Sequence, residues 1–221
     1  MLCRSGFFPL AACTVLGVMF LAARFVFTNS IQHGHLLWNV VLAWVPYVSG
    51  LVLAYRHERD QARRPRPIVT VILAATWLAF FPNAPYLVTD FVHFTPGDSF
   101  AWWYDVGLIA TFAWTGFILA VVSLSIVQEL VRQRWGTLWG WVVAVATILL
   151  SGVGIYLGRF VRLNSWDLVL RPVRVAKIFW SGLVNGSVTS PRTVGVTMMF
   201  SAMLLVFYVT WRTARPIAIR G

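Results

Sequence analysis

Charged residues are scarce in this sequence. Only 11% of its 221 residues are Asp, Glu, Lys or Arg, whereas an ordinary soluble domain contains about a quarter. Negatively charged residues are the rarer of the two kinds, since there are seven Asp and Glu against 18 Lys and Arg. Hydrophobic residues make up 59% of the chain. This composition excludes an ordinary soluble domain and a disordered chain. It predicts a membrane protein.

Cysteine and the familiar catalytic motifs are also nearly absent. Cys3 and Cys13 are the two cysteines, which excludes a disulfide framework and a cysteine metal site. The sequence has no Walker loop, Rossmann fingerprint, GxSxG elbow or HExxH pair. His33 and His35 with the Asp90–His93 pair are too weak a pattern to predict a metal site. No cofactor or metal is therefore expected.

Six apolar segments are long enough, or nearly so, to cross a bilayer as helices. They predict one all-α domain over 1–221, a polytopic membrane bundle with short re-entrant or interfacial helices on its outer face. The third segment is short, and the sequence leaves open whether it crosses fully. The expected spans cover 6–27, 36–55, 68–81, 102–127, 138–158 and 194–211.

The net charge of +11 has two explanations, nucleic acid or a membrane surface. Cations at span ends fix orientation and contact anionic lipid, so a bilayer partner is expected and a nucleic acid is not. With the N-terminus inside, most Lys and Arg fall in inner segments, and the first two outer loops have none. This distribution predicts a bacterial inner-membrane protein with both termini in the cytoplasm.

Two expected outer segments carry polar residues of unusual kind. After Pro82, Asn83 is expected to cap a half-helix on which Tyr86, Asp90 and His93 share one face. The alternative is a capped break with a solvated polar face. Asp105 lies just inside the fourth span, where an ionisable group is costly. It is either a paired or functional residue or a simple helix cap.

A third outer segment follows the fifth span. Arg159 and Arg162 are three residues apart, Asn164 is a candidate cap, and Asp167 follows. After Pro172 the polar and apolar residues predict an amphipathic helix on the outer membrane surface. Its alternative role is a lipid-headgroup anchor without chemistry.

These outer residues predict one shared pocket. We expect Arg159 or Arg162 to be the partner of Asp105, because they are the nearest outer-face cations by topology. Asp90, His93 and Asp105 are the acid–base candidates. The ligand-binding candidates are Asn83, Tyr86, Asp90, His93, Asp105, Arg159, Arg162, Asn164 and Asp167.

Three classes of function remain open on these residues. The first is binding or handling of an anionic lipid or lipid-linked phosphate at the outer face, since Arg matches phosphate geometry. The second is a membrane hydrolase or transferase with an Asp/His site. The third is a non-catalytic subunit of a membrane complex, with Gly154 and Gly158 allowing close approach of a partner or a second copy.

Three strings carry a resemblance to a known family. FFPNAPYLVTDFVHF (80–94), WWYD (102–105) and GRFVRLNSWDL (158–168) resemble the bacterial integral-membrane family called domain of unknown function 1361. The resemblance covers the chain from the second span to the sixth. It implies a multi-span bacterial membrane protein. It implies no established activity and assigns no catalytic residues.

Overall fold

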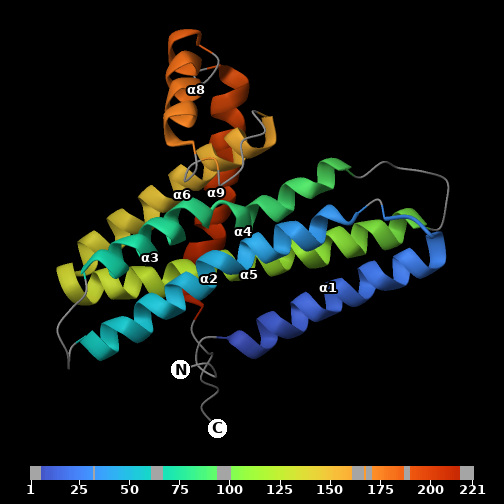
Figure 1. The fold of residues 1–221 in the computed structure, drawn as a ribbon, viewed down its shortest axis with the longest axis horizontal. Coiled ribbons are helices and arrows are strands. Elements are labelled where there is room, and N and C mark those ends of the chain that lie inside the picture. Colours follow the sequence, from blue (N-terminus) through green and yellow to red (C-terminus); the bar gives the residue numbers. More distant parts are fainter. Residues whose placement is uncertain are drawn as a thin grey trace.

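The computed structural model describes residues 6–31, 33–60, 67–93, 101–160, 167, 171–186 and 190–214. The secondary structure of these residues is helical, with no strand (Figure 1). The helices are α1 (Phe7–Thr28), α2 (His35–Asp60), α3 (Pro67–Phe80), α4 (Asn83–Tyr86), the 3-10 helix η1 (Leu87–His93), α5 (Ala101–Trp135), α6 (Thr137–Phe160), α8 (Pro172–Val184) and α9 (Pro191–Thr213). The predicted all-α fold is confirmed.

Six of these segments are long and apolar enough to span a membrane. They correspond to the six expected spans, although several run further than expected. α5 has 35 residues, or about 52 Å at the rise of an α-helix, whereas the hydrocarbon core is about 30 Å thick. Its last turns, with Arg132 and Arg134, therefore extend past an apolar layer or require a tilt.

The third span is a broken helix. α3 stops at Phe80, and α4 and η1 continue the path, so Pro67–Phe91 together are long enough to cross. Proline at 82 and 85 lacks the N–H that a continuous helix needs. Asn83 does not cap the following helix as expected, since its amide donates back to the Phe80 carbonyl at 3.0 Å. The break itself leaves that carbonyl in need of a donor.

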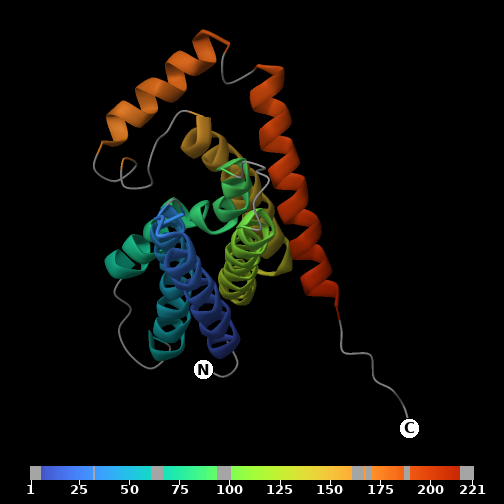
Figure 2. The same cartoon turned by 90° about the vertical axis from the view of Figure 1, so that its right-hand side faces the viewer.

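α5 is the centre of the bundle, and α1, α2, α4, η1 and α6 pack on it. Its buried residues include Phe112, Leu119 and Leu124. Gly116 allows α4 to approach α5 closely, because a side chain there would meet the Ala84 carbonyl oxygen at 2.2 Å. α9 packs along α6 and runs steeply across the direction of α1, α2 and α5 (Figures 1 and 2).

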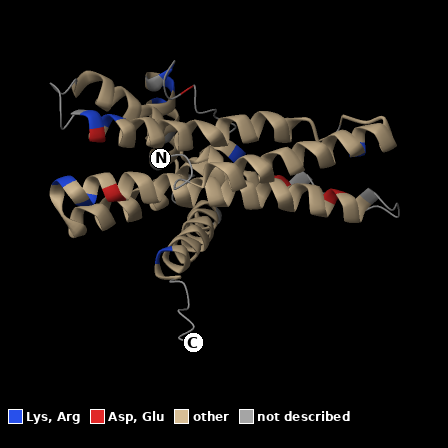
Figure 3. Ribbon diagram, turned by 90° about the horizontal axis from the view of Figure 1, so that it is seen from below, with Lys and Arg blue, Asp and Glu red and all other residues tan. Residues whose placement is uncertain are grey.

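Large apolar side chains cover the outside of the bundle as well as its core. Exposed examples are Met19 on α1, Val41 on α2, Ile72 on α3, Leu149 on α6 and Met198 on α9. Charged residues are few along the helices, which are tan over most of their length in Figure 3. An exterior of this kind suits lipid, since hydrocarbon replaces water as the solvent of the helix surface.

Candidate functional site

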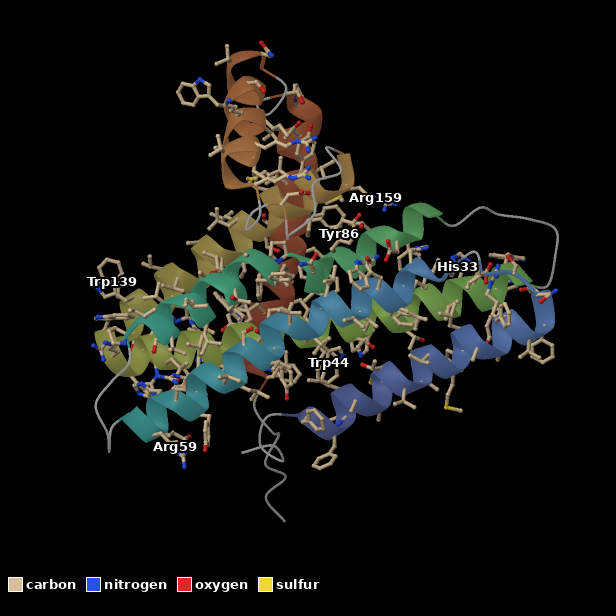
Figure 4. All side chains as sticks on the ribbon, in the orientation of Figure 1. His33, Trp44, Arg59, Tyr86, Trp139 and Arg159 are labelled. Carbon is tan, nitrogen blue, oxygen red and sulfur yellow. The ribbon has the colours of Figure 1, made fainter. Side chains whose placement is uncertain are left out.

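Three helix ends and the end of η1 meet at one end of the bundle. α1 ends at Thr28, α2 begins at His35, η1 ends at His93 and α5 begins at Ala101. Asp90 and Asp105 both lie here, so we call this the aspartate end. We call the opposite end, with Arg59, Arg132 and Arg134, the arginine end. The side chains between the helices at both ends can be followed in Figure 4.

Asp90 is more deeply buried than Asp105, the other described carboxylate at this end. It is 1% exposed and accepts a hydrogen bond from the Asn39 amide at 2.9 Å. The Arg159 guanidinium lies 3.8 Å from its Oδ1, and His35 Nε2 lies 3.9 Å from the same oxygen. A buried carboxylate requires such partners, because it has lost its hydration.

Arg159 joins Asp90 to Tyr86. Its Nη1 donates to the Tyr86 hydroxyl at 3.4 Å, and its label in Figure 4 lies beside that of Tyr86. Tyr86, Asp90 and Arg159, three of the predicted ligand-binding residues, are therefore neighbours. They come from α4, η1 and α6, so the contact closes the broken third span against the end of α6.

Asp105 forms a separate ion pair, and its partner is not the one expected. Arg24 of α1 holds it with two hydrogen bonds, Nη2 to Oδ2 at 2.9 Å and Nε to Oδ1. The Arg24 side chain is 7% exposed and that of Asp105 is 14% exposed. The expected pairing of Asp105 with Arg159 is wrong, since Arg159 faces Asp90. Arg162 lies outside the described residues.

The packing of α1 on α5 explains this pairing. The two helices run antiparallel, so the last turns of α1 lie beside the first turn of α5. The Tyr104 hydroxyl donates to the Phe20 carbonyl at 2.8 Å, and the two rings are in edge contact. Arg24 lies one turn beyond Phe20, so this register places it at Asp105.

His33 completes the Asp105 cluster. Its Nε2 lies 3.3 Å from Asp105 Oδ2, and the side chain is 2% exposed. Its Nδ1 is buried and has no hydrogen bond to any part of the chain that the structure describes. The two histidine rings of His33 and His35 are in edge contact at 6.1 Å. The Asp90 and Asp105 clusters are therefore neighbours, joined through the start of α2.

Four of the contributing residues were not predicted from the sequence. Arg24 lies near the end of the first apolar segment, where a cation is ordinary, and His33 and His35 entered only as a weak metal pattern. Asn39 gave no signal, because one amide in an apolar run has many structural explanations. Asparagine in an apolar helix is nevertheless a usable signal, since it needs a polar partner when buried.

The remaining predicted residues are less completely placed. His93 is the last residue of η1, and its side chain is among those not described. Asn164 lies outside the described residues, and the Asp167 carbonyl accepts from the Arg171 amide at 2.8 Å. Within the described part of the chain, no group of three or more His, Cys, Asp or Glu is arranged to hold a metal ion.

The lack of a side chain at Gly154 allows a close contact within this chain. A side chain there would meet Pro82 at 2.8 Å, so Gly154 allows α6 to approach the break after α3. Gly152 likewise lets α9 approach, since a side chain would meet the Ser201 hydroxyl at 2.2 Å. The partner contact through Gly154 and Gly158 stays a prediction.

Beyond the aspartate end of α6, α8 is the amphipathic helix expected after Pro172. It stands away from the bundle in Figures 1 and 2. Val173, Trp180 and Val184 form an exposed apolar stripe, because residues seven and eleven positions apart return to one helix face. Arg174 and Lys177 are exposed beside it. This pattern is typical of a helix at a membrane interface.

Comparison with known proteins places the chain in one family. No curated protein and no solved structure matches it. The family profile described as "Protein of unknown function (DUF1361)" matches residues 38–207, which include Asn39, Asp90, Asp105 and Arg159. The chain belongs to the DUF1361 family.

Proposed function

We propose that the protein is a multi-pass protein of the bacterial inner membrane, with both termini in the cytoplasm. We further propose that it binds an anionic lipid or a lipid-linked phosphate at its outer face. In this orientation the aspartate end faces outward and the arginine end faces the cytoplasm. The orientation rests on the distribution of Lys and Arg among the loops.

One observation carries the binding proposal. Arg159 is held in position by Tyr86 and Asp90 at the end of α6, and exposed Arg171, Arg174 and Lys177 follow along the chain. Among the described residues, the Asp90 and Asp105 clusters each pair one carboxylate with one arginine, so these pairs add little net charge. The last three cations have no carboxylate partner in the described segments. They supply the positive charge that attracts a phosphate.

The network at the aspartate end holds helix ends together. Arg159 is tied to α4 and η1, and Asp105 ties α1 to α5 through Arg24. Helix ends that are already rigid provide a preorganised surface, which lowers the entropy cost of binding. Trp180 on α8 suits the depth of a lipid headgroup, because its ring is apolar and its N–H is polar.

The orientation predicts opposite reporters at two loops. A reporter fused after Arg64 is expected in the cytoplasm and one fused after Asp98 outside, because Pro67–Phe91, which is long and apolar enough to cross, lies between them. Paired alkaline-phosphatase and fluorescent-protein fusions measure this. The same side for both fusions would mean that the third span does not cross.

Removing two cations of α8 is expected to weaken binding of a polyprenyl monophosphate by about 30-fold, from about 1 kcal/mol for each cation near the surface. The variant is Arg174→Gln with Lys177→Gln, titrated in nanodiscs of neutral lipid. Arg59→Gln removes an exposed cation at the arginine end and is the control. Equal affinity of the double variant and the control would contradict the proposal.

A second function is favoured by the two carboxylate–histidine contacts. His33 lies 3.3 Å from Asp105 and His35 lies 3.9 Å from Asp90, and a carboxylate beside an imidazole is the arrangement of a general base. An enzyme of this kind would release phosphate from the bound polyprenyl phosphate. Release that stops in His33→Ala would favour a hydrolase, whereas binding without release favours a carrier or receptor.

A further inference from the structure

A cavity lies at the arginine end, away from the network described above. It has a volume of about 650 Å³ and lies where α1, α5 and α9 meet. This volume falls within the range of about 300–1,000 Å³ that is usual for small-molecule sites. Its lining comes from the first turns of α1, the second half of α5 and the last turn of α9.

The walls of the cavity are mainly apolar. Leu10 and Cys13 come from α1, and Ile118, Val122 and Ile126 come from α5. Pro9 and Trp211 line the cavity and are also exposed, so the cavity opens onto the surface of the bundle. That surface is the apolar exterior of the helices. A hydrocarbon chain can therefore enter from the side without crossing water.

The polar end of the cavity carries an excess of positive charge. Glu129 lines it, but both of its oxygens are already held by Arg132, at 2.8 and 2.5 Å, and one also accepts from Gln133 at 3.0 Å. Arg212, in the last turn of α9, lines the cavity and is exposed. It has no hydrogen bond or ion pair within the described residues. An anion placed here meets an arginine whose donors are available.

We infer that this cavity binds an anionic phospholipid of the leaflet at the arginine end, with an acyl chain between α1, α5 and α9 and its phosphate on Arg212. Apolar walls alone would accept any lipid, and the cation selects the anionic one. Trp211 borders the same opening and is 48% exposed, which suits the headgroup level. Basic pockets between membrane helices are a recurrent type of lipid site.

This inference is independent of the proposed function, since no residue of the cavity belongs to the aspartate end or to α8. The probes are phosphatidylglycerol and phosphatidylcholine with identical chains. Each is titrated into the purified full-length protein in detergent, and bound lipids are counted by native mass spectrometry. We expect one molecule of phosphatidylglycerol to bind to each protein, and to bind more tightly than phosphatidylcholine does.

Two variants separate the polar end from the apolar walls. Arg212→Gln is expected to weaken phosphatidylglycerol binding about fivefold, to the level of phosphatidylcholine, as one interfacial cation contributes about this much. Ile118→Trp is expected to weaken both lipids because the larger side chain fills the cavity. Arg134→Gln and Val142→Trp are matched controls at exposed positions outside the cavity.

Chemical blocking keeps the test valid if Ile118→Trp fails to fold. In a Cys3→Ser variant, Cys13 is the remaining cysteine, and a bulky maleimide attached after purification would fill the cavity of a folded protein. Loss of phosphatidylglycerol binding after labelling supports the assignment of the lipid site to this cavity. An unchanged lipid preference in Arg212→Gln, or unchanged binding of both lipids after labelling, overturns it. Loss of binding only when residues 215–221 are removed also overturns it, by moving the site to that segment.

Discussion

Replacing Asp105 with alanine is expected to lower the free energy of unfolding by about 3–5 kcal/mol. The Arg24 guanidinium is nearly buried and directs two hydrogen bonds at this carboxylate. Removing the carboxylate takes away the acceptor of both hydrogen bonds and the negative charge that faces a nearly buried guanidinium. Removing both charges at once avoids that penalty, so the double variant Arg24→Ala with Asp105→Ala is expected to lose less than the sum of the two single variants.

Reversible denaturation in mixed micelles measures this coupling through a double-mutant cycle. Glu129 and Arg132 supply a control cycle, because they form an ion pair three residues apart whose side chains are 36% and 46% exposed. Solvent screens that pair, and little coupling is expected there. If the Arg24–Asp105 cycle gave no more coupling than the control, the ion pair would not contribute to holding α1 on α5.

Replacing Asp90 with alanine is expected to have the second large effect, again about 3–5 kcal/mol when one partner of a buried pair is removed. It removes the acceptor of the Asn39 amide and the Asp90 carboxylate that faces Arg159. The coupling of Asp90 with Arg159 should nevertheless be smaller than that of Asp105 with Arg24. Arg159 Nη1 lies 3.8 Å from Asp90 Oδ1, and this contact is not bidentate.

Tyr86→Phe is the matched conservative variant for this second cluster. It removes only the hydroxyl that accepts from Arg159 at 3.4 Å, so a loss of about 0.5–1.5 kcal/mol is expected. The same denaturation experiment measures it. A loss from Tyr86→Phe as large as that from Asp90→Ala would show that packing of the broken third span, rather than the buried charge, dominates the stability of this cluster.

The helices were predictable because each leaves a local signal. A run of about 20 apolar residues specifies a membrane helix without reference to the rest of the chain. The sequence also indicated the break after α3, since proline acts on its own turn. The internal geometry of that break was not predictable. Asn83 turns back to Phe80 because of a carbonyl that the break leaves exposed, and α4 with η1 packs against Gly116.

The site was only partly predictable, and Asp105 shows the reason. The sequence indicated that an aspartate inside an apolar span needs a cation. It did not indicate which cation, because the topology places one end of each of the six expected spans on that side of the membrane and says nothing about which ends are neighbours. Tyr86, Asp90 and Arg159 came from the strings that stood out. Arg24, His33 and Asn39 did not, since each has an ordinary explanation in its own segment.

By itself, the sequence determined the class of protein, the helical segments and the presence of costly ionisable groups near one end. These properties follow from composition, from the length of apolar runs and from local backbone chemistry. None of them depends on contacts between distant segments. Only the tertiary structure decided that α1 lies against α5, which pairs Arg24 with Asp105, and that α6 meets η1, which pairs Arg159 with Asp90. Helix packing among apolar surfaces depends on the fit of side chains from distant segments, and no single segment contains that information.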